Sequence, residues 1–376
     1  MKLDTLEGFD AARFLDQYWQ HKPCLIRGWL EPRPQTLAEM LSLAETHDLP
    51  SRLVSGNQES ANWELIHGPL ESDDLPEVGY DWTVLVQEMD KVSPDVSKIL
   101  EQFRFLPDWM VDDVMISQAA DGGSVGAHVD AYDVFLVQAE GQRRWQLATS
   151  YDNQLDDRFE MALLAHWKPQ VEVLVNPGDV LYLPAGIAHH GVAVGTCQTW
   201  SVGLRTPSGP EMLFYLAESL VESGGQAERL KCKRPDLAQP ALIDPGTLDQ
   251  ARTLLQGCLS LDDQGLGEIL GQMLTSWRLW HGQPSLEDTE QALRHLAAGH
   301  ALNLASNARL AMLDQGQGRR LFVNGEAIEC PTGLAIELAA SRKLSPAWHE
   351  QAEAIDHLIE LGAIARLPRP RIVASR

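Results

Sequence analysis

Two histidines and an aspartate in the middle of the chain have the types and spacing of metal ligands. Residues 122–130 read GGSVGAHVD and end with His128 and Asp130. Side chains two positions apart on a strand project to the same face, so these two would point together into a barrel. An imidazole and a carboxylate need one further ligand to complete a facial triad, which leaves coordination positions of Fe(II) open for a bidentate 2-oxo acid and dioxygen.

The third ligand should come from a distant antiparallel strand. Residues 178–190 read GDVLYLPAGIAHH, which is a turn, an apolar strand, a second turn and then His189 and His190. Neighbouring residues of an extended chain face opposite ways, so only one of these histidines should reach the metal, and spacing alone does not choose between them. A lone histidine is more often packed or solvated, but this ordered set favours a metal site.

The segments that must position these residues are short and rich in β-formers. Between about 110 and 205, strand-like runs alternate with glycine and proline turns, a pattern typical of a β-sandwich or barrel. The expected strands are 114–117, 134–137, 145–147, 171–175, 180–183 and 200–204. Asn176-Pro177-Gly178 is the strongest of the turn signals. We therefore predict a cupin-type barrel.

Helices are expected on both sides of this region. Near the N-terminus, Phe14, Leu15, Tyr18 and Trp19 fit one helix face, and residues 22–28 predict a strand that enters a turn. After Pro207 the apolar spacing becomes helical, over 212–221, 247–259, 262–280 and 286–298, with Gly224-Gly225 ending the first helix. The apolar stripes are expected to face a core, with an oligomer interface as the alternative.

The last part of the chain has a third pattern. Residues 321–328 predict a hairpin around Asn324-Gly325, and helices should follow at about 333–342 and 346–361. Helices with a small hairpin suggest a winged-helix fold. Residues 301–376 contain nine Lys or Arg and eight Asp or Glu with no basic stripe, so this domain is not expected to bind nucleic acid directly.

Composition narrows the class of protein. The chain has 376 residues, enough for two or three domains, and a formal net charge of −23, which disfavours nucleic acid and anionic lipid as partners and favours basic ones. It contains no apolar run long enough to span a membrane and no signal-peptide pattern at its first residues. Its five cysteines are widely spaced. A cytoplasmic protein with free thiols is expected.

Taken together, these motifs resemble those of the bacterial ribosomal oxygenases, JmjC enzymes of the cupin superfamily that hydroxylate an arginine of large-subunit ribosomal protein sixteen. The matching segments are 106–109 (LPDW), 112–117 (DDVMIS), 128–130 (HVD), 132–135 (YDVF), 141–145 (GQRRW), 177–179 (PGD), 184–189 (PAGIAH) and 200–205 (WSVGLR). Tyr18-Trp19, Lys22-Pro23 and residues 51–54 fit the N-terminal part. The resemblance is strong over about 1–207 and architectural beyond.

The resemblance assigns site residues. It implies that His128, Asp130 and His189 hold iron, and that Arg143, with Ser117 as a hydroxyl partner, binds the distal carboxylate of 2-oxoglutarate. The family has proline before its second ligand histidine and glutamate after it, whereas Ala188 and His190 stand here. This departure concerns the surroundings of the ligand and leaves the ligand itself in place.

The resemblance also implies an architecture and an activity. We expect an α+β protein with a double-stranded β-helix (JmjC) domain at 1–207, a helical dimerisation region at 208–300 and a winged-helix-like domain at 301–376. The expected activity is Fe(II)- and 2-oxoglutarate-dependent 3-hydroxylation of an arginine, with O2 as oxidant, a basic ribosomal protein as substrate and a homodimeric enzyme. The alternatives are a JmjC histidyl hydroxylase, a non-oxidative zinc or manganese cupin, and a binding module without activity.

Overall fold

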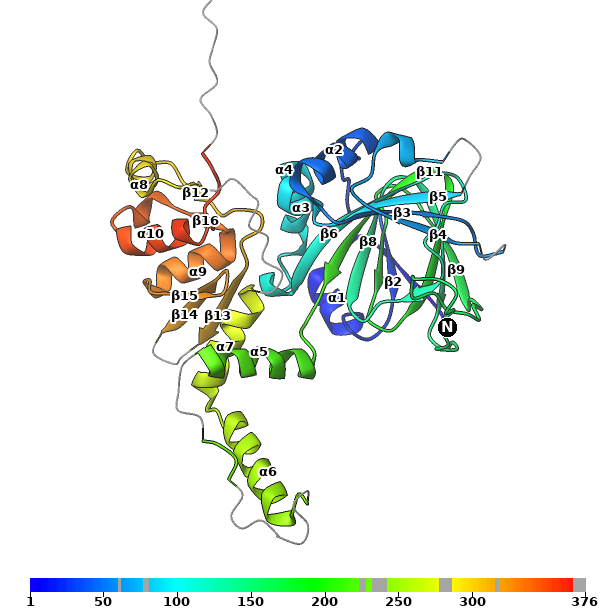
Figure 1. Ribbon diagram of the computed structural model, residues 1–376. Helices are drawn as coiled ribbons and strands as arrows, with labels where there is room; N and C mark the ends of the chain where they lie inside the picture. The colour runs from blue at the N-terminus through cyan, green and yellow to red at the C-terminus, as the bar shows by residue number, and fades with distance from the viewer. Residues whose placement is uncertain are drawn as a thin grey trace, which may run out of the picture.

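Two long antiparallel strands organise the N-terminal half of the protein. The computed structural model describes residues 1–59, 62–76, 81–222, 228–231, 242–276, 286–314 and 318–367. Strands β8 (Asp133–Ala148) and β11 (Ala188–Leu204) pair along their whole lengths, with an irregularity between Val194 and Gln198. Because the pair bends there, its two ends lie in opposite walls of a barrel (Figure 1).

The other strands extend these two walls. On one side the order is β1-β2-β10-β8-β11-β6-β5-β3-β4, while β9 pairs with the far half of β8 and β7 with the start of β11. Their bounds are β1 (Asp4–Glu7), β2 (Cys24–Arg27), β3 (Ser51–Ser55), β4 (Glu64–His67), β5 (Trp82–Val86), β6 (Val111–Ala119), β7 (His128–Val129), β9 (Val171–Val175) and β10 (Val180–Leu183). This arrangement confirms the predicted cupin barrel.

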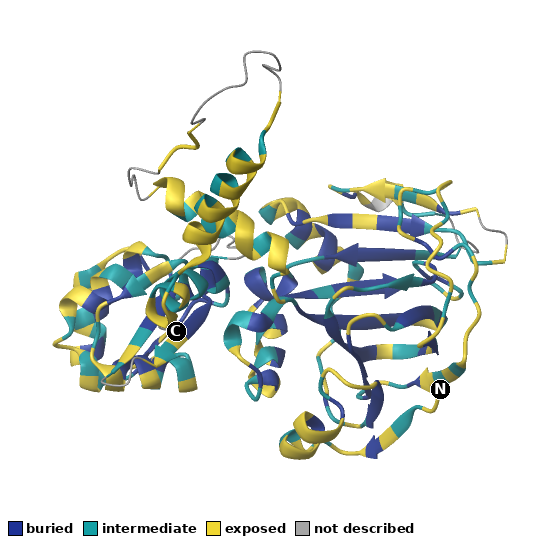
Figure 2. Ribbon diagram, turned by 90° about the horizontal axis from the view of Figure 1, so that it is seen from below, coloured by how far each residue is buried: buried dark blue, intermediate teal, exposed yellow. Residues whose placement is uncertain are grey.

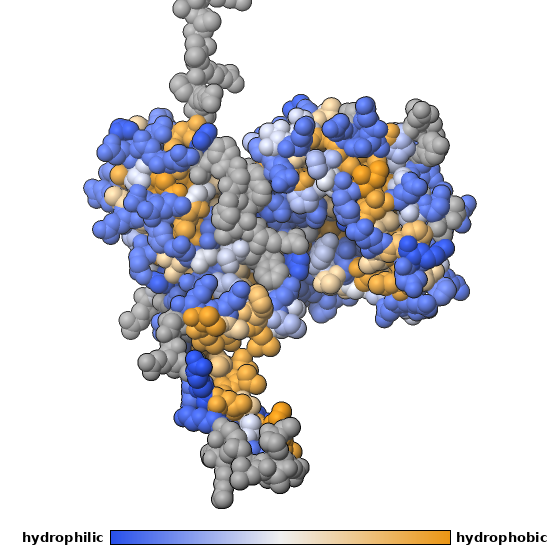
Figure 3. All heavy atoms as spheres, in the orientation of Figure 1, coloured by the Kyte–Doolittle hydropathy of each residue, from blue (hydrophilic) through white to orange (hydrophobic). Residues whose placement is uncertain are grey.

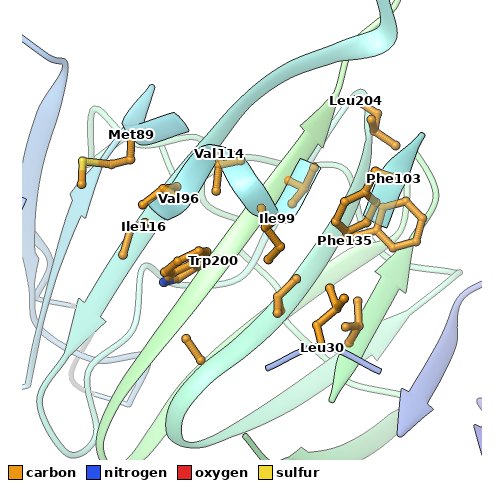
Figure 4. Packing of buried hydrophobic residues seen from close by; sticks show 14 of the residues in the cluster. Leu30, Met89, Val96, Ile99, Phe103, Val114, Ile116, Phe135, Trp200 and Leu204 are labelled. Carbon is orange, nitrogen blue, oxygen red and sulfur yellow. The ribbon is translucent and has the colours of Figure 1, made fainter. Parts of the chain in front are cut away.

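Helices cover the outer face of the larger wall. They are α1 (Ala11–Gln17), α2 (Leu37–His47), α3 (Met89–Val92) and α4 (Pro94–Ser97), with short 3-10 helices at η1 (Ser72–Asp74), η2 (Lys98–Phe103) and η3 (Asp108–Met110). Figure 4 shows Met89 and Val96 packed against Val114, Ile116 and Trp200 of the sheet. Burial of this apolar layer is the main force that holds the wall in place (Figure 2).

The C-terminal half has a core of its own. It contains α5 (Gly209–Glu222), α6 (Pro245–Leu259), α7 (Asp263–Ser276), α8 (Thr289–Ala297), β12 (Leu302–Asn303), β13 (Leu310–Asp314), β14 (Arg319–Val323), β15 (Glu326–Ile328), α9 (Thr332–Ser341), β16 (Lys343–Leu344), η4 (Pro346–Trp348) and α10 (Ala352–Glu360). Strands β13, β14 and β15 form an antiparallel sheet, and α8, α9 and α10 share one buried cluster with it. Asn324 and Gly325 both have positive φ, which confirms the predicted hairpin turn.

Several local predictions were wrong. Residues 134–137 and 145–147 were expected to be two strands but belong to one, β8. The strand continues through a bend at Gly141, which has a φ of 61°. A side chain at this position would clash with the carbonyl of Thr196. The helix expected over 346–361 is divided into η4 and α10, and Leu15 is exposed. The expected end of a helix at Gly224-Gly225 and the tail of the one at 262–280 lie outside the described residues.

Helices α5 and α6 differ most from expectation. Neither buries a single described residue, although both carry apolar side chains. Phe214 is 66% exposed and Leu255 is 67% exposed. Figure 3 shows apolar residues gathered along this part of the molecule. Their stripes therefore face no core formed by the residues that the structure describes. None of the helices in the described ranges has both the length and the apolar character needed to cross a bilayer.

Candidate metal centre

The three predicted ligands meet inside the barrel. Strand β7 pairs with the start of β11 so that His128 lies directly opposite His189, and Asp130 follows two residues after His128. The Nε2 atom of His189 is 3.6 Å from Oδ2 of Asp130, and Nε2 of His128 is 4.0 Å from Oδ1. One ligand atom from each residue lies within 4.8 Å of the others, the spacing that a single metal ion requires.

Backbone carbonyls orient both imidazoles. The Nδ1 atom of His128 is 3.0 Å from the Gly126 oxygen, and Nδ1 of His189 is 2.9 Å from the Ile187 oxygen. In each ring the Nδ1–H group donates to the carbonyl, so the Nε2 lone pair is free to bind a metal ion between the three ligands. Burial, reinforced by His128, lowers the pKa of His189 to about 4. Its ring is therefore neutral at physiological pH, the form that binds a metal.

His190 faces away from the centre. It is buried, its Nδ1 lies 3.3 Å from Oε1 of Gln146, and its ring meets Trp167 edge-on. The strand alternation that brings His189 inward turns His190 outward, so the choice left open by spacing is decided by the register of β11. Ala188 is fully buried opposite Val129 and does not line the pocket.

A pocket adjoins the ligand cluster. About 610 Å³ of empty space lies within it, a figure that includes the open solvent at its mouth. His128, Asp130 and His189 line one part, and Arg143, Ser117 and Asp113 line others. Asp113, Met115 and Ser117 alternate along β6 and point inward, while Val114 and Ile116 point outward to the helices.

Arg143 is a buried cation that forms no ion pair with the described residues. It is 3% exposed, and its Nε and Nη2 atoms have no hydrogen-bond partner among the described residues. The guanidinium lies 5.8 Å from the Trp145 ring. An uncompensated buried charge is costly, so this geometry fits a ligand carboxylate that binds Arg143 bidentately.

Ser117 is less available than its predicted role suggests. It is buried in the pocket wall, but its hydroxyl donates to the Thr199 carbonyl at 3.2 Å. In this rotamer it can only accept a further hydrogen bond, and it would donate to a ligand carboxylate after rotation of the hydroxyl.

Trp145 is a pocket residue that sequence reasoning missed. It lines the cavity, its ring is 5.8 Å from that of His189, and its buried Nε1 has no partner in the described part of the chain. Gly191 lies opposite on β11, where a Cβ would come within 2.7 Å of the Trp145 ring. A glycine inside a strand is a sequence signal for such close approach.

Comparison with known proteins assigns the family. Residues 98–212 match the JmjC domain. The chain is 30% identical over 340 residues, covering 87% of its length and 88% of the relative, to the ribosomal protein uL16 3-hydroxylase of Escherichia coli. The chain belongs to the JmjC ribosomal oxygenases. A probable ribosomal oxygenase of Haemophilus influenzae is 39% identical over 213 residues, which cover 52% of this chain and 49% of that protein.

Solved structures agree with this family. The Escherichia coli ribosomal oxygenase YcfD superposes with a TM-score of 0.77 at 26% identity, covering 95% of this chain and 98% of that one. A second YcfD structure, in complex with cobalt and 2-oxoglutarate, has a TM-score of 0.77 and covers 94% of this chain and 96% of that one. The similarity therefore extends over both halves of this ribosomal oxygenase.

The ligand assignment can be tested with two neighbouring histidines. We expect His189→Ala and Asp130→Ala to weaken Fe(II) or Co(II) binding by at least about tenfold, because each removes a donor of the cluster. His190→Asn should bind metal as the unchanged protein does, since its ring faces the other way. Isothermal titration under anaerobic conditions measures all three. Loss of binding in His190→Asn together with retention in His189→Ala would contradict the assignment.

Proposed function

We propose that this protein is an Fe(II)- and 2-oxoglutarate-dependent dioxygenase that 3-hydroxylates an arginine of ribosomal protein uL16. The observation that carries the proposal is the buried Arg143, whose Nε and Nη2 have no hydrogen-bond partner among the described residues, in the same pocket as a cluster of two histidines and an aspartate. The named activity of the Escherichia coli relative supplies the substrate, and the YcfD complex with cobalt and 2-oxoglutarate supports the cofactors.

The donor set suits iron. In this proposal His128, Asp130 and His189 would hold Fe(II) through two imidazoles and one carboxylate, a set that leaves positions open for co-substrate and oxygen. Iron with 2-oxoglutarate and O2 converts a substrate C–H to C–OH while 2-oxoglutarate becomes succinate and carbon dioxide. The carbonyls of Gly126 and Ile187 keep both imidazoles in the tautomer that binds metal.

The co-substrate lies between the metal ligands and Arg143. The guanidinium binds the distal carboxylate, with Ser117 as an adjacent hydroxyl. A zinc or manganese cupin with non-oxidative chemistry would have no use for this anchor. The same buried cation argues against a binding module that has lost its ligand, because without an anion two nitrogens of Arg143 stay buried with no hydrogen-bond partner among the described residues.

Asp113 is the carboxylate best placed to receive a basic side chain. It lines the pocket, whereas the Asp121 carboxylate accepts the Gly195 N–H outside it and Asp133 accepts the Tyr182 hydroxyl. Burial, with Asp90 and Asp112 adding to it, raises the pKa of Asp113 to about 7. A guanidinium at this carboxylate would favour its charged form and be held in place by it.

The proposal extends to assembly and location. We infer a homodimer through α5 and α6, because their apolar side chains are exposed and a second copy would cover them. The domains in this proposal are a catalytic unit over about 1–207, a helical dimerisation region, and a winged-helix-like unit. The last unit begins before the expected residue 301 and includes α8, since Ala292 and Leu296 share its core. The acidic chain suits a basic ribosomal partner in the cytoplasm, with no direct nucleic acid contact.

The substrate assignment is tested by mass spectrometry. Purified enzyme with Fe(II), 2-oxoglutarate and uL16 should add one oxygen atom to one arginine and produce succinate in equal amount. Asp130→Ala, which lacks a metal donor, is the control. Hydroxylation of a histidine in another ribosomal protein, with uL16 unchanged, would favour the histidyl hydroxylase alternative.

Arg143 and its neighbour Arg144 offer a matched pair for the co-substrate. We expect Arg143→Gln to raise the KM for 2-oxoglutarate by about tenfold or more, because a buried charge-assisted pair is lost. Arg144 is half exposed and pairs with Glu172, so Arg144→Gln should leave that KM unchanged. Initial rates of succinate formation measure both. Equal effects of the two substitutions would contradict the anchor role.

If Asp113 binds the substrate arginine, the KM for the substrate should depend on pH. Below its pKa of about 7 the group is neutral in the free enzyme, so the KM for an arginine peptide should fall as pH rises through that value. Asp113→Asn should raise this KM by about tenfold and remove its pH dependence. A peptide with citrulline in place of the arginine, which has a similar shape without charge, should show no such dependence. A KM for the arginine peptide that is constant with pH would exclude this role.

The dimer is tested by sedimentation. The protein should sediment as a dimer, and Phe214→Asp with Leu255→Asp should shift it to the monomer, because each places a charge in the covered apolar face. A monomeric unsubstituted protein would refute the interface.

A further inference from the structure

Arg309, in the C-terminal half, reaches the strand that lines the pocket. It lies just before β13 and is 6% exposed. Its Nε donates to the Val111 carbonyl at 3.0 Å, and its Nη2 donates to the Asp112 carbonyl at 3.0 Å. These carbonyls belong to the first two residues of β6. A planar guanidinium that donates from two of its nitrogens to successive carbonyls fixes the direction of the strand at that point.

The same guanidinium is anchored on its other edge. Its Nη1 donates to the Ser306 carbonyl at 3.1 Å and to the Ala308 carbonyl at 3.4 Å. Both acceptors lie in the loop that carries Arg309 itself. The side chain is therefore a rigid connection between that loop and the start of β6, because the carbonyls that accept from it hold it on both sides.

Asp90 holds the next part of β6. Its side chain is fully buried, its Oδ1 accepts the Val114 N–H at 2.8 Å, and its Oδ2 is 3.7 Å from Nη2 of Arg309. Arg309 and Asp90 thus fix the backbone at Val111, Asp112 and Val114, on either side of Asp113. Asp113 in turn accepts the Glu88 N–H at Oδ2 and points into the pocket.

We propose that Arg309 is a positioning residue for substrate binding, through which the C-terminal domain sets the direction of the Asp113 carboxylate in the pocket. The inference rests on the proposed function, in which Asp113 receives the basic side chain of the substrate. Arg309 touches neither the metal ligands nor Arg143. Its loss therefore acts on the protein substrate and leaves 2-oxoglutarate binding intact.

Charge supports the same conclusion. Burial raises the pKa of Asp90, and Arg309 opposes that rise. Without Arg309 the start of β6 would contain a buried carboxyl group with less compensation, next to a pocket carboxyl whose own pKa is already raised. Asp90 would then no longer hold the Val114 N–H in the same geometry, so the direction of Asp113 would change, and this change weakens the binding of a cation.

The test compares Arg309→Gln with Arg342→Gln. Arg342 connects the same two parts of the protein, since its Nη1 donates to Asp108 at 2.6 Å and its Nη2 to the Ala305 carbonyl at 2.8 Å, but within the described ranges it donates no hydrogen bond to β6. With the full-length enzyme and a uL16 peptide, Arg309→Gln should raise the peptide KM by about tenfold, with kcat changed by less than about threefold. Arg342→Gln should raise that KM by less than about twofold. The KM for 2-oxoglutarate should stay constant in both.

Two further variants separate positioning from loss of folding. The double variant Asp90→Asn/Arg309→Gln removes both buried charges, so it should keep a melting temperature near that of the unsubstituted protein, yet its peptide KM should stay raised because the carbonyl contacts are missing. Arg309→Lys keeps the charge with fewer donors and should restore the KM in part.

The result that overturns the proposal is a folded Arg309→Gln or double variant with the peptide KM of the unsubstituted enzyme, or with the same change as Arg342→Gln. Failure of the proposed function would be recognised by another result, which concerns the unsubstituted enzyme. In that case the unsubstituted enzyme itself neither binds nor hydroxylates the uL16 peptide, although it converts 2-oxoglutarate slowly to succinate without it.

Discussion

The structure depends on the antiparallel pairing of β7 with the first residues of β11, which sets His128 opposite His189. Because side chains alternate along a strand, a slip of one residue would replace His189 by His190 and turn the ligand out of the barrel. The continuous pairing of β11 with β8 fixes this register over fourteen residue pairs, so a large part of the barrel wall serves to hold two imidazoles in place. The bend at Gly141 then places the other end of the β8–β11 pair in the second wall of the barrel.

The pocket contains polar groups that the fold leaves unsatisfied. Arg143 and the Trp145 Nε1 are both buried without partners in the described residues, and each reduces the stability of the ligand-free protein. Groups of this kind persist where a ligand compensates them, because binding then recovers the hydrogen bonds that folding lost. A dicarboxylic acid between the metal and Arg143 would satisfy the guanidinium. Stability and co-substrate binding should therefore be linked in this protein.

The C-terminal half contributes in two different ways. Its sheet and α8 to α10 form a separate core, and that core is connected to the barrel by polar contacts, including those of Arg309 and Arg342. Such contacts are directional, so they fix how the two parts meet more strictly than an apolar interface would. Helices α5 and α6 instead expose apolar side chains, and none of their described residues is buried.

The sequence by itself determined the barrel class, the three ligand candidates and the hairpin at Asn324, because strand periodicity, turn residues and ligand types are local properties. It also indicated Arg143, through a resemblance. The resemblance also chose His189 over His190, but only the tertiary structure shows the strand register that turns His189 inward and His190 outward. Only the tertiary structure decided that Asp113 lines the pocket while Asp121 and Asp133 do not, and that Arg309 reaches β6 from almost two hundred residues away. These facts depend on strand register, on burial and on contacts between distant segments, and no local pattern of residues encodes them.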